Sequence, residues 1–123
     1  MSEINRHDDV TLAKRYINKF NKCVAREIDW QISFSDYKRL MKIKRCQYTG
    51  MELTDPDCEP NKPTDRTIDR INAELPYTKD NIIICCHAAN SLKAVWEDNR
   101  NPLTNSLVYN MMNKINQLEK RNA

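Results

Sequence analysis

The sequence predicts an α+β fold in which a ββα module, a two-stranded hairpin followed by a helix, is embedded among amphipathic helices. Residues 82–86 form a short apolar run of the kind that makes a buried strand, and Ile68 and Ile71 bracket a second extended segment upstream. Residues 87–96 contain no Gly or Pro and place their larger apolar side chains on one helical face. Helical spacing of apolar residues also recurs near both ends of the chain.

The first predicted helix runs from about Thr11 to Arg26. Its apolar residues recur every three to four positions, and Asp9 or Thr11 can serve as its N-cap. The opposite face is basic and carries Lys14, Arg15, Lys19, Lys22 and Arg26. A solvated surface is one interpretation of this face, and contact with nucleic acid is the other.

A short extended segment, residues 28–34, leads to a second predicted helix that Ser33 or Ser35 can cap. Five basic residues follow its start, and we expect them to bind nucleic acid: Lys38, Arg39, Lys42, Lys44 and Arg45. Basic residues near the C-terminus of a helix also complement the helix dipole, which is the alternative role for them.

Charge divides the chain into three predicted parts of a single compact domain. Residues 1–45 form a basic helical part with 11 Lys/Arg and 6 Asp/Glu, a net +5. Residues 46–98 hold 5 Lys/Arg and 10 Asp/Glu, a net charge of −5. Residues 99–123 hold 4 Lys/Arg and 1 Asp/Glu, a net charge of +3. A helix over 103–121 is expected to pack back on the rest, and a partner or a second copy is the alternative. A basic front suits phosphates, and an acidic module suits a divalent cation.

Composition favours a soluble protein of a reducing cytoplasm. No apolar run approaches the roughly 20 residues of a membrane span, and the polar start does not resemble a secretory signal. The five cysteines are odd in number and irregularly spaced, which argues against a disulfide framework.

Three motifs occupy the middle of the chain. The first is the run CQYTG, Cys46 to Gly50, which contains the only glycine of the sequence and suits a tight turn with positive φ. The second is TIDRIN, residues 67–72. The third begins at Tyr77 and runs through a loop Asn and the apolar strand to an Asn-x-x-Lys segment, residues 90–93.

In order and spacing these motifs resemble the HNH, or ββα-metal, endonuclease module of small phage-encoded proteins. The resemblance covers about residues 45–98. It implies that Asp69 and Asn90 hold Mg²⁺ or a similar divalent cation, that Asn81 is the structural loop Asn, and that Lys93 contacts nucleic acid.

Two departures from the family pattern affect the expected chemistry. Arg70 occupies the position of the family's general-base His, and arginine stays protonated and cannot accept a proton from water. It can instead clamp a phosphate or pair with Asp69. His87 is the candidate replacement base, although a His at a helix start also often hydrogen-bonds locally.

The second departure concerns the zinc site that many HNH modules carry. Cys46 and Cys86 remain, but Thr49 and Ala89 occupy the other two thiol positions. Two thiolates are too few for a closed tetrahedral site, so we expect no structural zinc.

Two classes of function follow. The first is a metal-dependent endonuclease, and the second is a non-catalytic regulator that uses the fold to bind nucleic acid or a host protein. We expect an HNH-like protein that binds nucleic acid, DNA rather than RNA, in the cytoplasm of a bacterial host. Because the motif His is absent, the expected cleavage activity is weak or nil.

Overall fold

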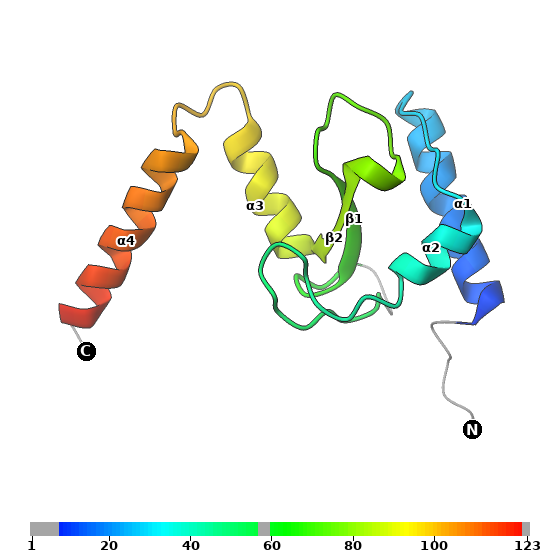
Figure 1. Ribbon diagram of the computed structural model, residues 1–123, viewed down its shortest axis with the longest axis horizontal. Helices are drawn as coiled ribbons and strands as arrows, with labels where there is room; N and C mark the ends of the chain where they lie inside the picture. The colour runs from blue at the N-terminus through cyan, green and yellow to red at the C-terminus, as the bar shows by residue number, and fades with distance from the viewer. Residues whose placement is uncertain (1–7, 57–59, 122–123) are drawn as a thin grey trace. The chain divides into compact units, whose positions relative to one another are not determined.

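The computed structural model describes residues 8–56 and 60–121, and this part of the chain has an α+β fold with four helices, a 3₁₀ turn and one antiparallel hairpin (Figure 1). The chain divides into two compact units, Met1–Asn90 and Ser91–Ala123. The predicted boundaries after residues 45 and 98 stay predictions. None of the described helices combines the length and the apolar character that a membrane span requires.

Helix α1 spans Asp9–Ala25. Its N-cap is Asp8, whose side chain accepts a hydrogen bond from the backbone N–H of Thr11 at 2.9 Å. The cap therefore lies just before the expected Asp9 or Thr11, because the helix begins two residues earlier than the apolar spacing indicated. The helix ends where Glu27 adopts a positive φ of 58°.

Helix α2 spans Phe34–Leu40 and is capped by Ser33, one of the two expected residues. The extended segment before it is joined to the loop after the first strand. Trp30 and Tyr77 form an isolated parallel bridge, and the backbone N–H of Tyr77 donates to the carbonyl of Asp29 at 3.0 Å.

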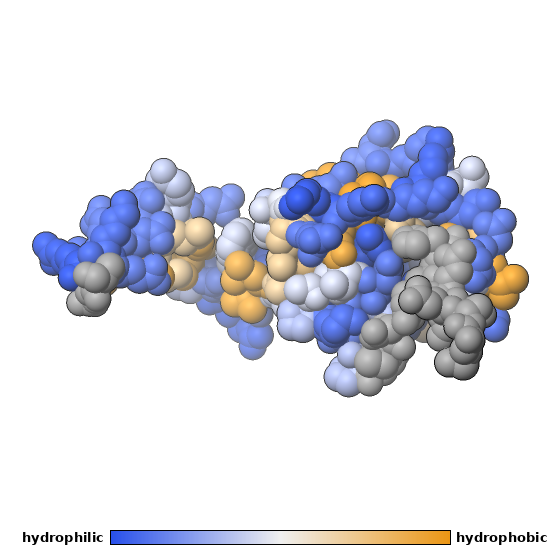
Figure 2. Space-filling view, turned by 90° about the horizontal axis from the view of Figure 1, so that it is seen from below, coloured by the Kyte–Doolittle hydropathy of each residue, from blue (hydrophilic) through white to orange (hydrophobic). Residues whose placement is uncertain are grey.

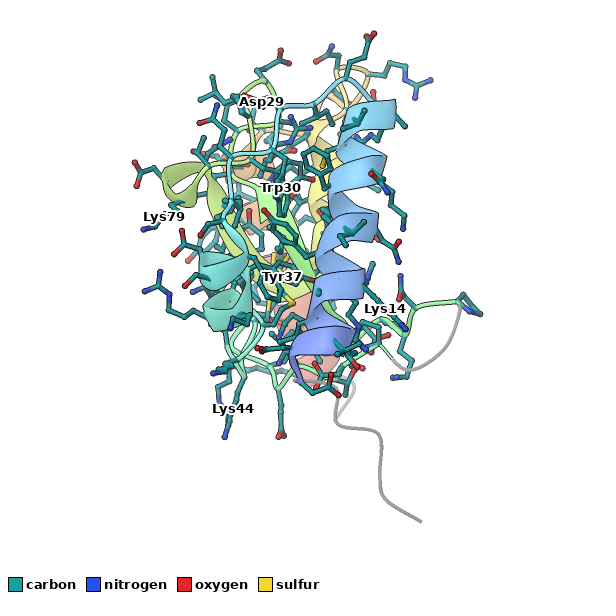
Figure 3. All side chains as sticks on the ribbon, turned by 90° about the vertical axis from the view of Figure 1, so that its right-hand side faces the viewer. Lys14, Asp29, Trp30, Tyr37, Lys44 and Lys79 are labelled. Atoms are coloured by element: carbon teal, nitrogen blue, oxygen red, sulfur yellow. The ribbon has the colours of Figure 1, made fainter. Side chains whose placement is uncertain are left out.

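An aromatic cluster fills the core beneath α1. Tyr16 makes edge-to-face contacts with Trp30, Phe34 and Tyr37 at centroid distances between 5.4 and 5.8 Å. Trp30 also packs on Tyr77 at 5.2 Å. Figure 3 shows the labelled Trp30 and Tyr37 side by side with α1, facing the inside of the unit. This cluster fixes α1 and α2 against the hairpin.

The hairpin pairs β1 (Arg66–Arg70) with β2 (Ile82–Cys86) in antiparallel register, from Arg66 opposite Cys86 to Arg70 opposite Ile82. The connecting loop contains the 3₁₀ turn η1 (Lys79–Asn81). Strand β2 continues without a break into α3 (His87–Glu97), so the expected order of hairpin and helix is present.

The second unit contains the rest of α3 and helix α4 (Asn105–Arg121). Lys93 forms an ion pair with Glu97 at 2.8 Å, one turn along α3. In α4 only Val108 is buried, and large apolar side chains such as Met112 stay exposed. In Figure 2 hydrophilic residues cover most of the larger unit's visible face, and hydrophobic residues appear there as separate patches.

Candidate functional site

The turn from Cys46 to Gly50 lies against β2. The backbone N–H of Gln47 donates to the carbonyl of Ile84, and the side chain of Gln47 accepts from the N–H of Ile84, both at 2.8 Å. Gly50 closes the turn with a φ of 80°, and its N–H donates to the carbonyl of Cys46 at 2.7 Å. The turn is therefore held to the hairpin edge by backbone and side-chain bonds.

This attachment brings Tyr48 to Asp69. The Tyr48 hydroxyl donates a hydrogen bond to Oδ2 of Asp69 at 3.0 Å. Asp69 lies opposite Ile83 in the hairpin and is half-buried. The carboxylate expected to bind a metal thus already has a phenolic donor.

Arg70 is directed towards the loop that follows β1. Its guanidinium donates to the carbonyl of Leu75 at 3.0 Å and lies 5.1 Å from the centre of the Tyr77 ring. These contacts occupy the side chain that replaces the general-base His of the HNH pattern.

Asn81 ties the two ends of that loop together. Its side-chain oxygen accepts from the N–H of Asn72 at 2.9 Å, and its amide donates to the carbonyls of Asn72 and Pro76 at 3.0 and 2.9 Å. The residue is buried, so these bonds satisfy polar groups that water cannot reach.

The thiol of Cys46 lies in a ring of donors. The N–H of Thr49 is 3.4 Å from Sγ. Burial alone raises the pKa of Cys46, but hydrogen bonds from the Thr49 side chain and from the backbone N–H groups of Cys86, Thr49 and Tyr48 lower it to about 7. Cys46 and Cys86, the two thiol positions of the family's zinc knuckle that remain, are therefore neighbours, and Thr49 occupies a third position as a donor.

His87 lies near the opposite end of β1 from Asp69. It directly follows Cys86, which pairs with Arg66, so Asp69 is three residues further along the strand, or about 10 Å. Its N–H donates to the carbonyl of Asp65 at 3.0 Å, and its side chain lines a cavity beside α1. The hairpin register therefore separates His87 from Asp69, although both lie in the same unit.

Burial lowers the pKa of His87. The negative charge of Asp65 opposes this shift and the positive charge of Lys19 adds to it. The direction of this shift favours the neutral imidazole, which can accept or donate a hydrogen bond.

Asn90 follows His87 by one turn on α3 and is half-buried. Among the described residues no three His, Cys, Asp or Glu side chains gather as a metal-binding group. Asp69 and Asn90, the two ligands that the resemblance implies, carry one carboxylate and one amide carbonyl oxygen, groups of the kind that bind a hydrated Mg²⁺.

The five expected nucleic-acid-binding residues in and after α2 differ in their surroundings. Lys38 is paired with Asp9 at 3.5 Å, Arg39 is paired with Asp36, and Arg45 donates to the carbonyl of Gly50 at 3.0 Å. Lys42 and Lys44 are exposed and have no recorded hydrogen bond or ion pair within the described part of the chain. They flank a groove whose lining also includes Glu52 and Asp55.

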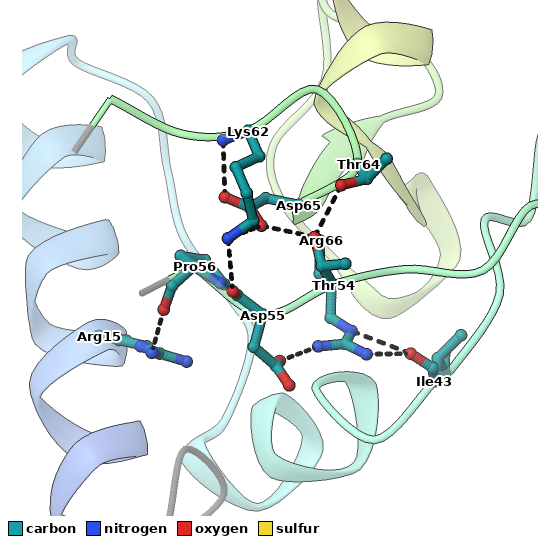
Figure 4. Close-up of polar contacts among 9 residues, drawn as sticks. All are labelled: Arg15, Ile43, Thr54, Asp55, Pro56, Lys62, Thr64, Asp65 and Arg66. Atoms are coloured by element: carbon teal, nitrogen blue, oxygen red, sulfur yellow. Dashed lines mark hydrogen bonds and ion pairs between the residues drawn. The ribbon is translucent and has the colours of Figure 1, made fainter. Parts of the chain in front are cut away.

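A buried polar network at the start of β1 was not anticipated from the sequence (Figure 4). Asp65 is fully buried and accepts from the Thr54 hydroxyl and the Lys62 N–H at 2.7 and 2.8 Å. The guanidinium of Arg66 donates twice to the carbonyl of Ile43, at 2.9 and 2.7 Å, and pairs with Asp55. The only sequence signal was a polar Thr-Asp-Arg run after a proline-rich loop, which is typical of an exposed turn.

Comparison of the chain with protein-family models, with curated proteins and with solved structures found no match.

Proposed function

We propose that this protein is a nucleic-acid-binding protein built on an HNH-like ββα module whose phosphodiester cleavage is weak or absent. The observation that carries the proposal is the state of Arg70, whose guanidinium is engaged with Leu75 and Tyr77 at the position where an active module needs a base. The hairpin that runs directly into α3, with a glycine-closed turn held to its edge, supports the HNH-like interpretation.

Cleavage needs a cation at the scissile phosphate and a base that activates water. Asp69 and Asn90 offer oxygen ligands for the cation. Arginine supplies no base, and His87 is separated from Asp69 along the strand. Oxygen ligands for a cation without a nearby base favour binding of nucleic acid without efficient cleavage.

Binding is expected to be electrostatic and salt-dependent. Lys42 and Lys44 follow α2 and are exposed. When they contact phosphates, they would displace counterions from the nucleic acid, which makes the affinity depend on salt. The mixed groove beside them, which includes Glu52 and Asp55, predicts modest affinity at physiological salt.

A binding experiment tests the first half of the proposal. Affinity for a duplex and for a single strand is measured at several salt concentrations for the wild type and for Lys42→Glu/Lys44→Glu. A double variant of α4, Lys114→Glu/Lys120→Glu, makes the same change in net charge and serves as the control. We expect the first variant to lose at least about tenfold in affinity and the salt slope to fall by roughly two.

If the wild type binds neither duplex nor single strand at low salt, the nucleic-acid proposal is wrong and a protein partner becomes the favoured ligand. Equal losses in the two double variants would mean that net charge alone drives binding.

A plasmid-nicking assay with Mg²⁺ or Mn²⁺ tests the second half. We expect the wild type to show no cleavage above background. Wild-type cleavage that Asp69→Ala abolishes would place the protein among active endonucleases and contradict the expectation of weak or absent catalysis.

A further inference from the structure

A cavity of about 280 Å³ lies between α1, α2, the first half of β1 and the start of α3. All of these elements belong to the first unit. Neither Asp69 nor Asn90 lines the cavity, so it is separate from the candidate metal position. Its volume is close to the lower limit of roughly 300 Å³ for small-molecule sites, which suits a compact ligand.

Three cations of α1 line one wall of this cavity: Arg15, Lys19 and Lys22. They follow one another at spacings of four and three residues and therefore share one face of the helix. Like charges at these spacings repel and destabilise a helix by a few tenths of a kcal/mol per pair. An anion bound beside this face would relieve that repulsion.

The charges of this wall are only partly used within the protein. One Nη of Arg15 donates to the carbonyl of Pro56 at 2.7 Å, and Lys19 lies 4.9 Å from the centre of the Tyr77 ring. Lys22 is exposed and has no ion pair recorded within the described residues. None of these contacts supplies a negative charge.

The described lining residues include no Asp or Glu. Two carboxylates of the described residues next to the lining are already paired: the half-buried Asp55 with Arg66, and the buried Asp65 with Lys62 at 3.2 Å. The wall opposite α1 adds His87, whose side chain can donate a hydrogen bond. The described lining therefore joins the positive charge of α1 with a neutral donor, a combination that suits a multiply charged oxyanion.

We propose that this cavity is a binding site for a phosphate group, held by Lys19 and Lys22 of α1 with His87 on the opposite wall. A free phosphate compound, such as pyrophosphate or a mononucleotide, and the backbone phosphate of a nucleic acid present the same chemistry. The site does not depend on the basic residues that follow α2 or on cleavage.

The test uses pyrophosphate as the probe, titrated into the 123-residue protein by calorimetry in a chloride buffer of low ionic strength. The critical variant is Lys22→Glu, and its matched control is Lys14→Glu. Both replace an exposed lysine of α1 with the same change in charge, but only Lys22 lines the cavity. We expect Lys22→Glu to weaken pyrophosphate binding by about tenfold or more and Lys14→Glu to change it by less than about twofold.

Thermal melting of each variant establishes that it is folded, and Lys19→Gln provides a second variant with a milder change. Absence of pyrophosphate binding by the wild type, or equal losses in the two glutamate variants, would overturn the proposal. A short single-stranded oligonucleotide identifies the source. If it displaces pyrophosphate and its own affinity falls in Lys22→Glu, the site holds a backbone phosphate. If it does neither while pyrophosphate binds, the ligand is a free phosphate compound.

The pyrophosphate experiment and the nucleic-acid-binding experiment can fail independently of each other. Loss of nucleic-acid binding in Lys42→Glu/Lys44→Glu with pyrophosphate binding intact concerns only the residues after α2. Loss of pyrophosphate binding in Lys22→Glu with those residues unchanged concerns only the cavity.

Discussion

The hydroxyl of Tyr48 donates a hydrogen bond to the carboxylate of Asp69, 21 positions later in the chain, at 3.0 Å. Tyr48 reaches this position because the neighbouring Gln47 is fixed to Ile84 of β2 by two hydrogen bonds. The turn that in the HNH pattern carries half of a zinc site thus contributes a donor to the carboxylate that the same pattern assigns to the catalytic cation.

Tyr48→Phe is predicted to strengthen the binding of a divalent cation. The substitution removes a donor that satisfies the Asp69 carboxylate and leaves the ring in place, so a metal no longer competes with that bond. We expect the Kd for Mn²⁺, measured by electron paramagnetic resonance or calorimetry, to fall about two- to tenfold. In an Asp69→Ala background, Tyr48→Phe should no longer change the affinity for Mn²⁺. Unchanged Mn²⁺ affinity in Tyr48→Phe would show that Asp69 is not a ligand.

Cys46 is predicted to make folding stability rise with pH. Its pKa is about 7 in the folded protein, while an unfolded cysteine titrates near 8.5 to 9, so the unfolded state binds more protons between these values. Its stabilising contribution is present above the unfolded pKa and is lost as the pH falls through 7. Urea unfolding under reducing conditions should show a gain of about 2 kcal/mol between pH 6.5 and 9.

Cys46→Ala should flatten this dependence, and Cys23→Ala, which removes another buried thiol, should leave it in place. A Cys46→Ala profile parallel to that of the wild type would assign the pH dependence to another group.

Local patterns were sufficient for the elements of the fold. The run at 82–86 is β2, the segment from His87 forms α3, and Ser33 caps α2, each because the signal lies within a few consecutive residues. The α+β class and the hairpin followed by a helix are confirmed.

Local sequence patterns did not predict contacts between segments that are distant in the chain. Asp65 is fully buried because Thr54, eleven positions earlier, and Lys62 supply its donors, and no spacing rule anticipates that pairing. The position of His87 beside Lys19 depends on how α1 crosses the hairpin. Sequence reasoning placed His87 on the side of Asn90 by helical spacing alone, and that argument carries no information about the packing of α1.

Asp65→Asn is predicted to destabilise the fold by about 3 kcal/mol, because it removes the buried carboxylate and leaves the Lys62 N–H and the Lys62 charge with a weaker acceptor. Asp80→Asn, at an exposed position, should change the free energy of unfolding by less than about 0.5 kcal/mol. Chemical denaturation measures both.

The same carboxylate predicts sensitivity to acid. Burial alone would raise the pKa of Asp65, but hydrogen bonds from Thr54 and from Lys62, and the charge of Lys62, together hold it below its ordinary value. The ionised Asp65 carboxylate therefore contributes to folding stability above about pH 4, and this contribution is lost as the pH falls through the lowered pKa. The wild type should lose more stability than Asp65→Asn between pH 5 and 3, and equal losses would contradict this account.

Thr49→Cys/Ala89→Cys is predicted to create a zinc site. Cys46 and Cys86 are already neighbours. Thr49 occupies the place of the second cysteine in a Cys-x-x-Cys pair, and its N–H contacts the Cys46 sulfur. The double variant should bind one zinc per chain and gain thermal stability that a chelator removes. The wild type should bind none by metal analysis. Failure of the double variant to bind zinc while folded would contradict the comparison of the Cys46 turn with the family's zinc-binding turn.

Arg70→His is predicted to produce metal-dependent nicking above that of the wild type. The guanidinium is held by the Leu75 carbonyl and the Tyr77 ring and cannot accept a proton, whereas a neutral imidazole next to Asp69 can activate water. General-base catalysis is worth about 10²- to 10⁴-fold, so the gain in plasmid relaxation with Mg²⁺ or Mn²⁺ should be measurable.

Arg70→Gln distinguishes a new base from the mere loss of a cation, because it removes the same charge without adding a proton acceptor. Asp69→Ala/Arg70→His should be inactive, since the imidazole has no metal-bound phosphate to act on. Activity in Arg70→His alone identifies a site that lacks only its base. If Arg70→His and Arg70→Gln are equally inactive while Mn²⁺ still binds at Asp69, the bound cation does not sit where a phosphate can reach it. The protein is then a binding protein for a reason other than the loss of the motif His.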